Sequence, residues 1–140
     1  MRLYWQHNVH ACMAACAQMI LAYYGKKVPR QSDIRRDMAT DENDGTHHLV
    51  LRMQLRKYGV EMKDVGCTVP AVTRQLESSH PILLSVRPWR LNKAAHAILV
   101  TEYRSGKVKV YDPFPPWLPM WCNVEKVMAK ARDSWSFNLK

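Results

Sequence analysis

Three residues along this chain could together form a reactive thiol site: Cys12, then His96, then Asp112. Cys12 lies where a polar segment gives way to a helical pattern. A helix N-terminus and a nearby imidazolium both favour the thiolate over the thiol. His96 lies in a strand-like apolar run, and Asp112 follows a later one, from which it could fix the tautomer of that imidazole. This order predicts a Cys–His–Asp set for nucleophilic attack on a carbonyl carbon.

The predicted site also has a candidate oxyanion donor. Backbone N–H groups in the first turn of a helix beginning near Cys12 would supply half of an oxyanion hole. The side-chain amide of Gln6, six positions earlier, could donate the other hydrogen bond. An amide in a loop usually meets only water, so Gln6 alone is a weak signal.

Each residue also has an ordinary structural interpretation. A cysteine in an apolar helix usually packs as a small buried side chain, as we expect for Cys16 one turn later. His96 could be a core histidine with satisfied hydrogen bonds. Asp112 before Pro113 is also a turn signal. The helix-start position of Cys12, with Gln6 upstream, favours the catalytic interpretation.

The elements that must position these residues follow from hydrophobic spacing. A helix is predicted over about 11–24, ending at Gly25. Further helices are expected at 33–39, 46–58, 70–77 and 124–131, with caps at Ser32, Thr46, Thr68 and Asn123. In the second of these, the core-facing residues would be Leu49, Met53 and Leu55. Strands are expected at 60–62, 81–86, 95–103, 107–111 and 134–139, with a turn at Ser105–Gly106 and a stiff loop over 114–119. Helices come first and an antiparallel sheet second, which predicts one α+β domain over residues 1–140.

Composition and charge narrow the class of protein. The chain has 140 residues and is 47% hydrophobic, which suits one folded domain. Its net charge of +9 favours anionic partners, and an acidic protein is a good candidate. The charges are scattered without interleaved aromatics, which argues against nucleic acid. No apolar run is long enough for a membrane span, and the N-terminus does not resemble a secretory signal.

Cofactors are not expected. His7, His10 and Cys12, with His47 and His48, could suggest a metal site, but their spacing matches no common zinc pattern. A disulfide framework is not expected either, because the chain can bury a core unaided. The two remaining cysteines, Cys67 and Cys122, fall in segments that we expect to be loops.

The residues resemble the papain-like cysteine peptidases, in particular the compact bacterial branch of C39-like and AvrRpt2-like effector proteases. The resemblance runs from Gln6 to Pro113 and rests on Gln6-x5-Cys12, 19–25, 55–60, 81–86, 96–101 and 108–113. It implies a helical half with the catalytic Cys at a helix start, packed on an antiparallel sheet that carries the His. It also implies Cys12 as nucleophile, His96 as base and acid, Asp112 as orienting residue and Gln6 as oxyanion donor. Met13 departs from that pattern, since one branch usually has tryptophan there and the other glycine.

The expected function is therefore a thiol peptidase, a hydrolase that acts on a protein or peptide through a thioester. The resemblance suggests a bacterial effector or toxin with an acidic immunity or inhibitor protein. The expected location is the cytoplasm of the producing cell, or secretion or injection by a route that needs no signal peptide. Two alternatives stay open. The same site could serve a deamidase, transglutaminase or acyltransferase, or the fold could be a non-catalytic module that binds an acidic partner. Residues 87–94, just before His96, are expected to form one wall of the substrate cleft.

Overall fold

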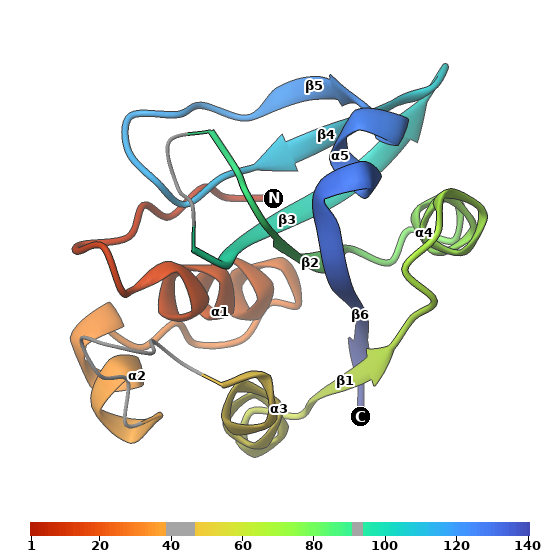
Figure 1. Ribbon diagram of the computed structural model, residues 1–140. Coiled ribbons are helices and arrows are strands. Elements are labelled where there is room, and N and C mark those ends of the chain that lie inside the picture. The colour runs from red at the N-terminus through yellow and green to blue at the C-terminus, as the bar shows by residue number, and fades with distance from the viewer. Residues whose placement is uncertain (39–46, 91–93) are drawn as a thin grey trace. The chain divides into compact units, whose positions relative to one another are not determined.

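The computed structural model describes residues 1–38, 47–90 and 94–140, and it has the predicted α+β architecture (Figure 1). In chain order, its elements are α1 (Cys12–Tyr23), α2 (Gln31–Asp37), α3 (His48–Lys57), β1 (Val60–Asp64), α4 (Val69–Glu77), β2 (Ile82–Val86), β3 (His96–Arg104), β4 (Lys107–Tyr111), β5 (Met120–Asn123), α5 (Val124–Lys130) and β6 (Ala131–Leu139). The chain divides into two compact units. The first comprises residues 1–62, 113–117 and 138–140, and the second comprises 63–112 and 118–137.

Helix α1 is the centre of the first unit and contacts both α2 and α3 (Figure 1). Every residue from Ala14 to Leu21 is buried, so the helix is covered on all sides. Cys16 is fully buried among these residues, as expected. The helix ends before Gly25, whose φ of 70° is the left-handed conformation that glycine adopts most easily.

Helix α3 buries one of its three predicted core residues, Leu55, and exposes the other two. Leu49 and Met53 are 53% and 66% exposed, whereas Leu51, Gln54 and Leu55 are buried. The apolar pattern was wrong at Leu49 and Met53, because one core position of the helix is occupied by the polar Gln54. Residues 39–46, with the predicted polar loop and the Thr46 cap, lie outside the described part of the chain. The observed N-cap is His47, whose Nδ1 accepts the N–H of Leu49.

The sheet is antiparallel, with the strand order β1-β6-β2-β3-β4-β5, and most of its strands belong to the second unit. Strand β2 lies between β3 and β6 and is almost entirely buried. Helix α4 packs on β2 and β3 and also contacts α5. The sheet core comprises Val72, Leu76, Ile82, Leu84, Val86, Trp89, Ile98, Val100, Val108, Val110, Val124, Val127, Met128 and Ala131.

Most of the predicted turns and caps in this part of the chain are confirmed. Ser105 and Gly106 have φ of 50° and 78°, as a tight hairpin turn between β3 and β4 requires. Thr68 and Asn123 cap α4 and α5 by accepting the backbone N–H groups of Ala71 and Lys126.

Two further predictions about local structure were wrong. Helix α2 begins at Gln31, so Ser32 lies inside it and Arg30 is the N-cap. Strand β5 was missed, and Cys122 lies in it, paired with Val108, and not in a loop. The strand has only four residues and none of them is buried, so it lacks the alternation that marks a longer strand. Of the described helices, none has both the length and the apolar character needed to cross a bilayer.

Candidate active site

His96 and Asp112 form a hydrogen-bonded pair within the second unit. Nε2 of His96 lies 2.8 Å from Oδ1 of Asp112, and the two residues are 5% and 1% exposed. The sheet register explains this contact. Leu99 pairs with Tyr111, so extending the ladder by one residue places Asp112 opposite Ile98. His96 is two residues before Ile98 and therefore shares its face of the sheet.

The other oxygen of the Asp112 carboxylate has two further partners, a hydrogen-bond donor and a cation. The indole Nε1–H of Trp89 donates to Oδ2 over 2.8 Å, and Nε of Arg90 lies 3.3 Å from the same atom. A guanidinium keeps its positive charge at all ordinary pH values. Hydrogen bonds and a cation at a buried carboxyl both favour its ionised form. Because an anionic Asp112 can only accept, the Nε2 atom of His96 carries the hydrogen.

Sequence patterns did not point to Trp89 and Arg90 as partners of Asp112. They fall in residues 87–94, the predicted cleft wall, of which 91–93 lie outside the described residues. The Trp89 residue is only 6% exposed and belongs to the sheet core. The guanidinium of Arg90 and the ammonium of Lys130 lie 5.7 and 5.6 Å from its ring centre. Trp89 therefore has little exposed surface with which to contact a substrate. The available signal was that a buried indole N–H needs an acceptor.

Cys12 is the first residue of α1, as predicted. Ala11 is the N-cap and makes no side-chain capping bond. The thiol-bearing residue is partly buried. None of the residues in the first turn of α1, all of them described, is acidic. The partial positive charge of the helix N-terminus is therefore not offset by a carboxylate of that turn, which favours a thiolate at this position.

Gln6 is held in the turn that leads into α1. Its Nε2 donates to the carbonyl of Asn8 over 2.8 Å, and the N–H of Ala11 donates to the same carbonyl. Gln6 is 5% exposed, and among the described residues its Oε1 has no hydrogen-bond partner. An amide nitrogen carries two hydrogens, of which Asn8 takes one. The other could be given to a substrate oxygen.

The four predicted site residues are divided between the units. Gln6 and Cys12 belong to the first, and His96 and Asp112 belong to the second. The backbone N–H of Gln6 donates to the carbonyl of Pro113, the residue that follows Asp112, over 2.7 Å.

The other cysteines differ from Cys12 in their surroundings. Burial raises the pKa of the Cys67 thiol. Burial is also the main cause of the raised pKa of Cys122, which Asp112 raises further and Arg90 lowers. All four cysteines are in the described part of the chain, and none forms a disulfide. Within that part, no group of three or more His, Cys, Asp or Glu side chains could hold a metal ion.

The sequence profile of the Peptidase C39-like family matches residues 1–136. No curated protein sequence matches the chain significantly.

Several solved structures have the same fold. The peptidase domain of Streptococcus ComA, a bi-functional ABC transporter involved in quorum sensing, is 17% identical with a TM-score of 0.82. That match covers 99% of this chain and 96% of that domain. A double glycine motif protease from an AMS/PCAT transporter, solved in complex with the leader peptide, is 21% identical with a TM-score of 0.73, over 99% and 91% of the two chains. A C39-like protein of Bacillus anthracis is 12% identical with a TM-score of 0.75, over 99% and 94%.

Proposed function

Because this chain belongs to the Peptidase C39-like family, a family of cysteine peptidases, we propose that it cleaves peptide bonds with a Cys12–His96–Asp112 triad and Gln6 as oxyanion donor. The observation that carries the proposal is the buried His96–Asp112 pair, whose Nε2–Oδ1 distance is 2.8 Å. With Nε2–H bound to Asp112, the Nδ1 atom of His96 is the one that would exchange a proton with Cys12.

The first half of the proposed reaction forms a thioester. The Cys12 thiolate attacks the carbonyl carbon, and the carbonyl oxygen becomes an anion. The N–H groups at the start of α1 and the amide of Gln6 donate hydrogen bonds to that anion. The imidazolium of His96 then gives its proton to the departing amine as the carbon–nitrogen bond breaks.

The second half releases the product. Neutral His96 takes a proton from water, and the resulting hydroxide adds to the thioester carbon. The carbon–sulfur bond breaks, the new carboxylic acid leaves, and the thiolate of Cys12 returns beside the imidazolium of His96. Asp112 keeps the ring in one tautomer and stabilises the imidazolium through both halves.

The proposed substrate class is a peptide with small residues before the cleaved bond. The support is the fold shared with a double glycine motif protease that was solved with its leader peptide. An extended substrate with two glycines would approach a partly buried thiol more closely than one with larger side chains, because glycine has no Cβ.

A labelling experiment tests the reaction. Purified protein is incubated with a synthetic peptide containing a Gly-Gly site, in water enriched in heavy oxygen and with added glycinamide. We expect cleavage after Gly-Gly, with one heavy oxygen in the new carboxyl group and no cleavage by Cys12→Ala. A product that carries glycinamide in place of heavy oxygen would identify a transferase. A Cys12→Ala variant with full activity would contradict the triad.

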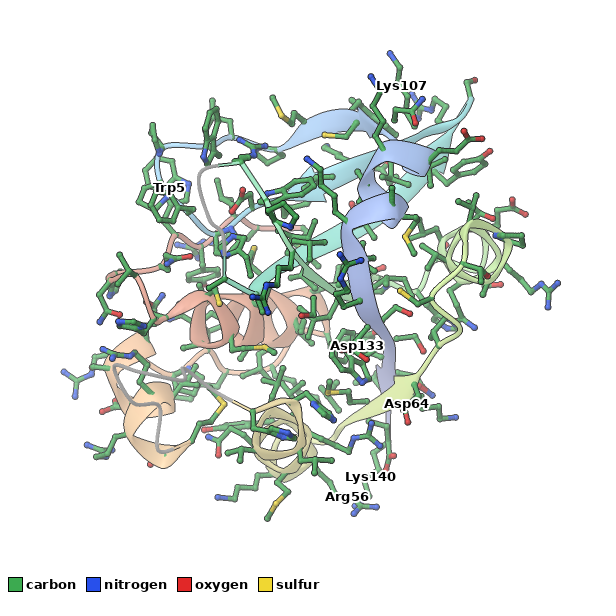
Figure 2. The ribbon with its side chains drawn as sticks, in the orientation of Figure 1. Trp5, Arg56, Asp64, Lys107, Asp133 and Lys140 are labelled. Atoms are coloured by element: carbon green, nitrogen blue, oxygen red, sulfur yellow. The ribbon has the colours of Figure 1, made fainter. Side chains whose placement is uncertain are left out.

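The role as a delivered effector or toxin, its location and its acidic inhibitor or immunity protein stay predictions. The support for an acidic partner is the net charge of +9, carried by exposed side chains such as Lys107, which points away from the ribbon in Figure 2. Binding to poly-glutamate that weakens as salt is raised would agree with such a partner. Equal retention of poly-glutamate and an uncharged polymer would contradict it.

A further inference from the structure

We propose that Gln31 is a positioning residue for Gln6, holding the backbone from which the oxyanion donor extends. The inference rests on the proposed function, because it gives Gln6 the same role. Gln31 is the first residue of α2 and is 1% exposed. Its side chain forms three hydrogen bonds, all within the first unit.

The amide of Gln31 binds both peptide groups that flank Gln6. Its Oε1 accepts the N–H of His7 at 2.7 Å, and its Nε2 donates to the carbonyl of Trp5, labelled in Figure 2, at 3.0 Å. The orientations of these two planar groups define φ and ψ of the residue between them. One side chain therefore fixes the backbone conformation of Gln6. The carbonyl of Pro113 adds a third constraint by accepting the N–H of Gln6.

A further amide fixes Gln31 itself. Nε2 of Gln31 also donates to Oε1 of Gln18 at 2.9 Å, and Nε2 of Gln18 donates to the carbonyl of Pro29 at 3.0 Å. Gln18 lies in α1, the helix that begins with Cys12, and is 5% exposed. Buried amides are costly to leave unsatisfied, so this arrangement resists rearrangement. It connects the backbone of Gln6 to the helix that carries the thiol.

Such a connection has a consequence for the reaction. An oxyanion donor contributes only when its N–H is aimed at the developing charge, and a shift of 1 Å can cost roughly 100-fold. If Gln31 only docks the N-terminal segment, its loss should lower stability and leave oxyanion binding unchanged. If it positions Gln6, its loss should weaken oxyanion binding through Gln6.

Two reactions of the Cys12 sulfur separate these roles. Iodoacetamide alkylates the thiolate without creating an oxyanion. The peptide aldehyde acetyl-Gly-Gly-glycinal adds reversibly: sulfur bonds to the aldehyde carbon, and the carbonyl oxygen becomes an oxyanion or, after taking a proton, a hydroxyl. We expect Gln6→Ala and Gln31→Met each to weaken aldehyde binding by roughly 10-fold or more, consistent with loss of an oxyanion donor. Alkylation rates should stay within about twofold of wild type, since the thiolate is untouched.

Gln54→Met is the matched control. It makes the same exchange at another glutamine of the first unit, which is 3% exposed, and should bind the aldehyde like wild type.

A double-variant cycle tests whether Gln31 acts through Gln6. If Gln31 acts through Gln6, the Gln6→Ala/Gln31→Met protein binds the aldehyde no more weakly than Gln6→Ala alone. Losses that multiply, or a Gln31→Met protein that binds like wild type, overturn the role of Gln31. If Gln31→Met does not fold, Gln31→Glu takes its place, because it keeps an acceptor for His7 but loses the amide donors. Wild-type protein without an aldehyde adduct on Cys12 overturns the proposed function and this inference together.

Discussion

Nε2 of His96 and Oδ1 of Asp112 are 2.8 Å apart, and the pair lies on neighbouring strands of one ladder, with Asp112 just past the end of β4. The backbone pairing of β3 with β4 therefore sets the position of His96 relative to Asp112, and this position does not depend on a loop. Both residues are at least nine-tenths buried, so the interaction is little screened by water. A dyad held in this way is organised before any substrate binds.

Replacing Asp112 by asparagine should remove the anion that holds His96. An asparagine has only one acceptor oxygen, so its NH₂ group would face the N–H of either His96 or Trp89, both of which now donate to Asp112. We expect kcat on a Gly-Gly peptide to fall by roughly 100- to 10,000-fold. Asp133→Asn, at an exposed residue labelled in Figure 2, is the control and should retain wild-type kcat. An Asp112→Asn protein with near-normal kcat would show that Asp112 does not orient the base.

Trp89→Phe should separate the indole hydrogen bond from the packing of the ring. The variant keeps an aromatic side chain in the core but leaves Oδ2 of Asp112 without the donor at 2.8 Å. Loss of a buried, charge-assisted hydrogen bond should lower the free energy of unfolding by roughly 1–3 kcal/mol. Urea unfolding would measure this. The control is Trp121→Phe, a partly exposed indole, and an equal, small loss in both variants would contradict the assigned bond.

Replacing Arg90 should change the basicity of His96. The guanidinium lies 3.3 Å from the carboxylate that stabilises the imidazolium, so it offsets part of the negative charge that His96 experiences. In Arg90→Gln the His96 pKa should rise, as NMR titration of the ring proton would show. Arg90 also lowers the pKa of Cys122, so alkylation of Cys122 should slow in the same variant.

Arg90→Lys is the control, because it keeps a cation near Asp112 and should change both properties less. Other ionisable groups near this carboxyl are His96, Cys122 and, across the Trp89 ring, Lys130. They are unchanged in both variants. A His96 pKa that is the same in wild type and Arg90→Gln would contradict the proposed balance of charges.

The fold could be predicted from the sequence to a large extent, because its elements have strong local signals. Gly25 and the Ser105–Gly106 turn are predictable because they depend on their own backbone conformation. Thr68 is predictable because it caps the helix that directly follows it in the sequence. The buried face of α3 was predicted correctly only at Leu55, because the buried polar Gln54 breaks the apolar pattern.

The candidate site divides in the same way. The helix start marked Cys12, and the strand pattern marked His96 and Asp112. The residues that hydrogen-bond to the site from distant parts of the sequence had no local signal. Trp89 is 23 positions from its partner Asp112, and Gln31 is 24 positions from its partner His7. Such contacts depend on tertiary packing, which spacing along one chain does not encode.

Cys67 and Cys122 should react slowly with alkylating reagents at neutral pH. Burial raises the pKa of both thiols, so the fraction present as thiolate at neutral pH falls below that of an ordinary cysteine, whose pKa is about 8.5. In a Cys12→Ser protein, the rates at these two positions should climb only as the pH rises above that value. Quantitative peptide mass spectrometry would follow each site. Labelling at neutral pH as fast as that of an unstructured cysteine peptide would contradict the buried environments.

The most direct test of the triad is the pH dependence of Cys12 alkylation in wild type and His96→Ala. Substoichiometric iodoacetamide is applied from about pH 5 to about pH 9, and the labelled peptides are identified by mass spectrometry. A thiolate–imidazolium pair predicts that Cys12 labels first, already near pH 6, and that His96→Ala removes this advantage. Cys12 labelling that is no faster than that of Cys67 or Cys122, or that is indifferent to His96, would contradict the catalytic account.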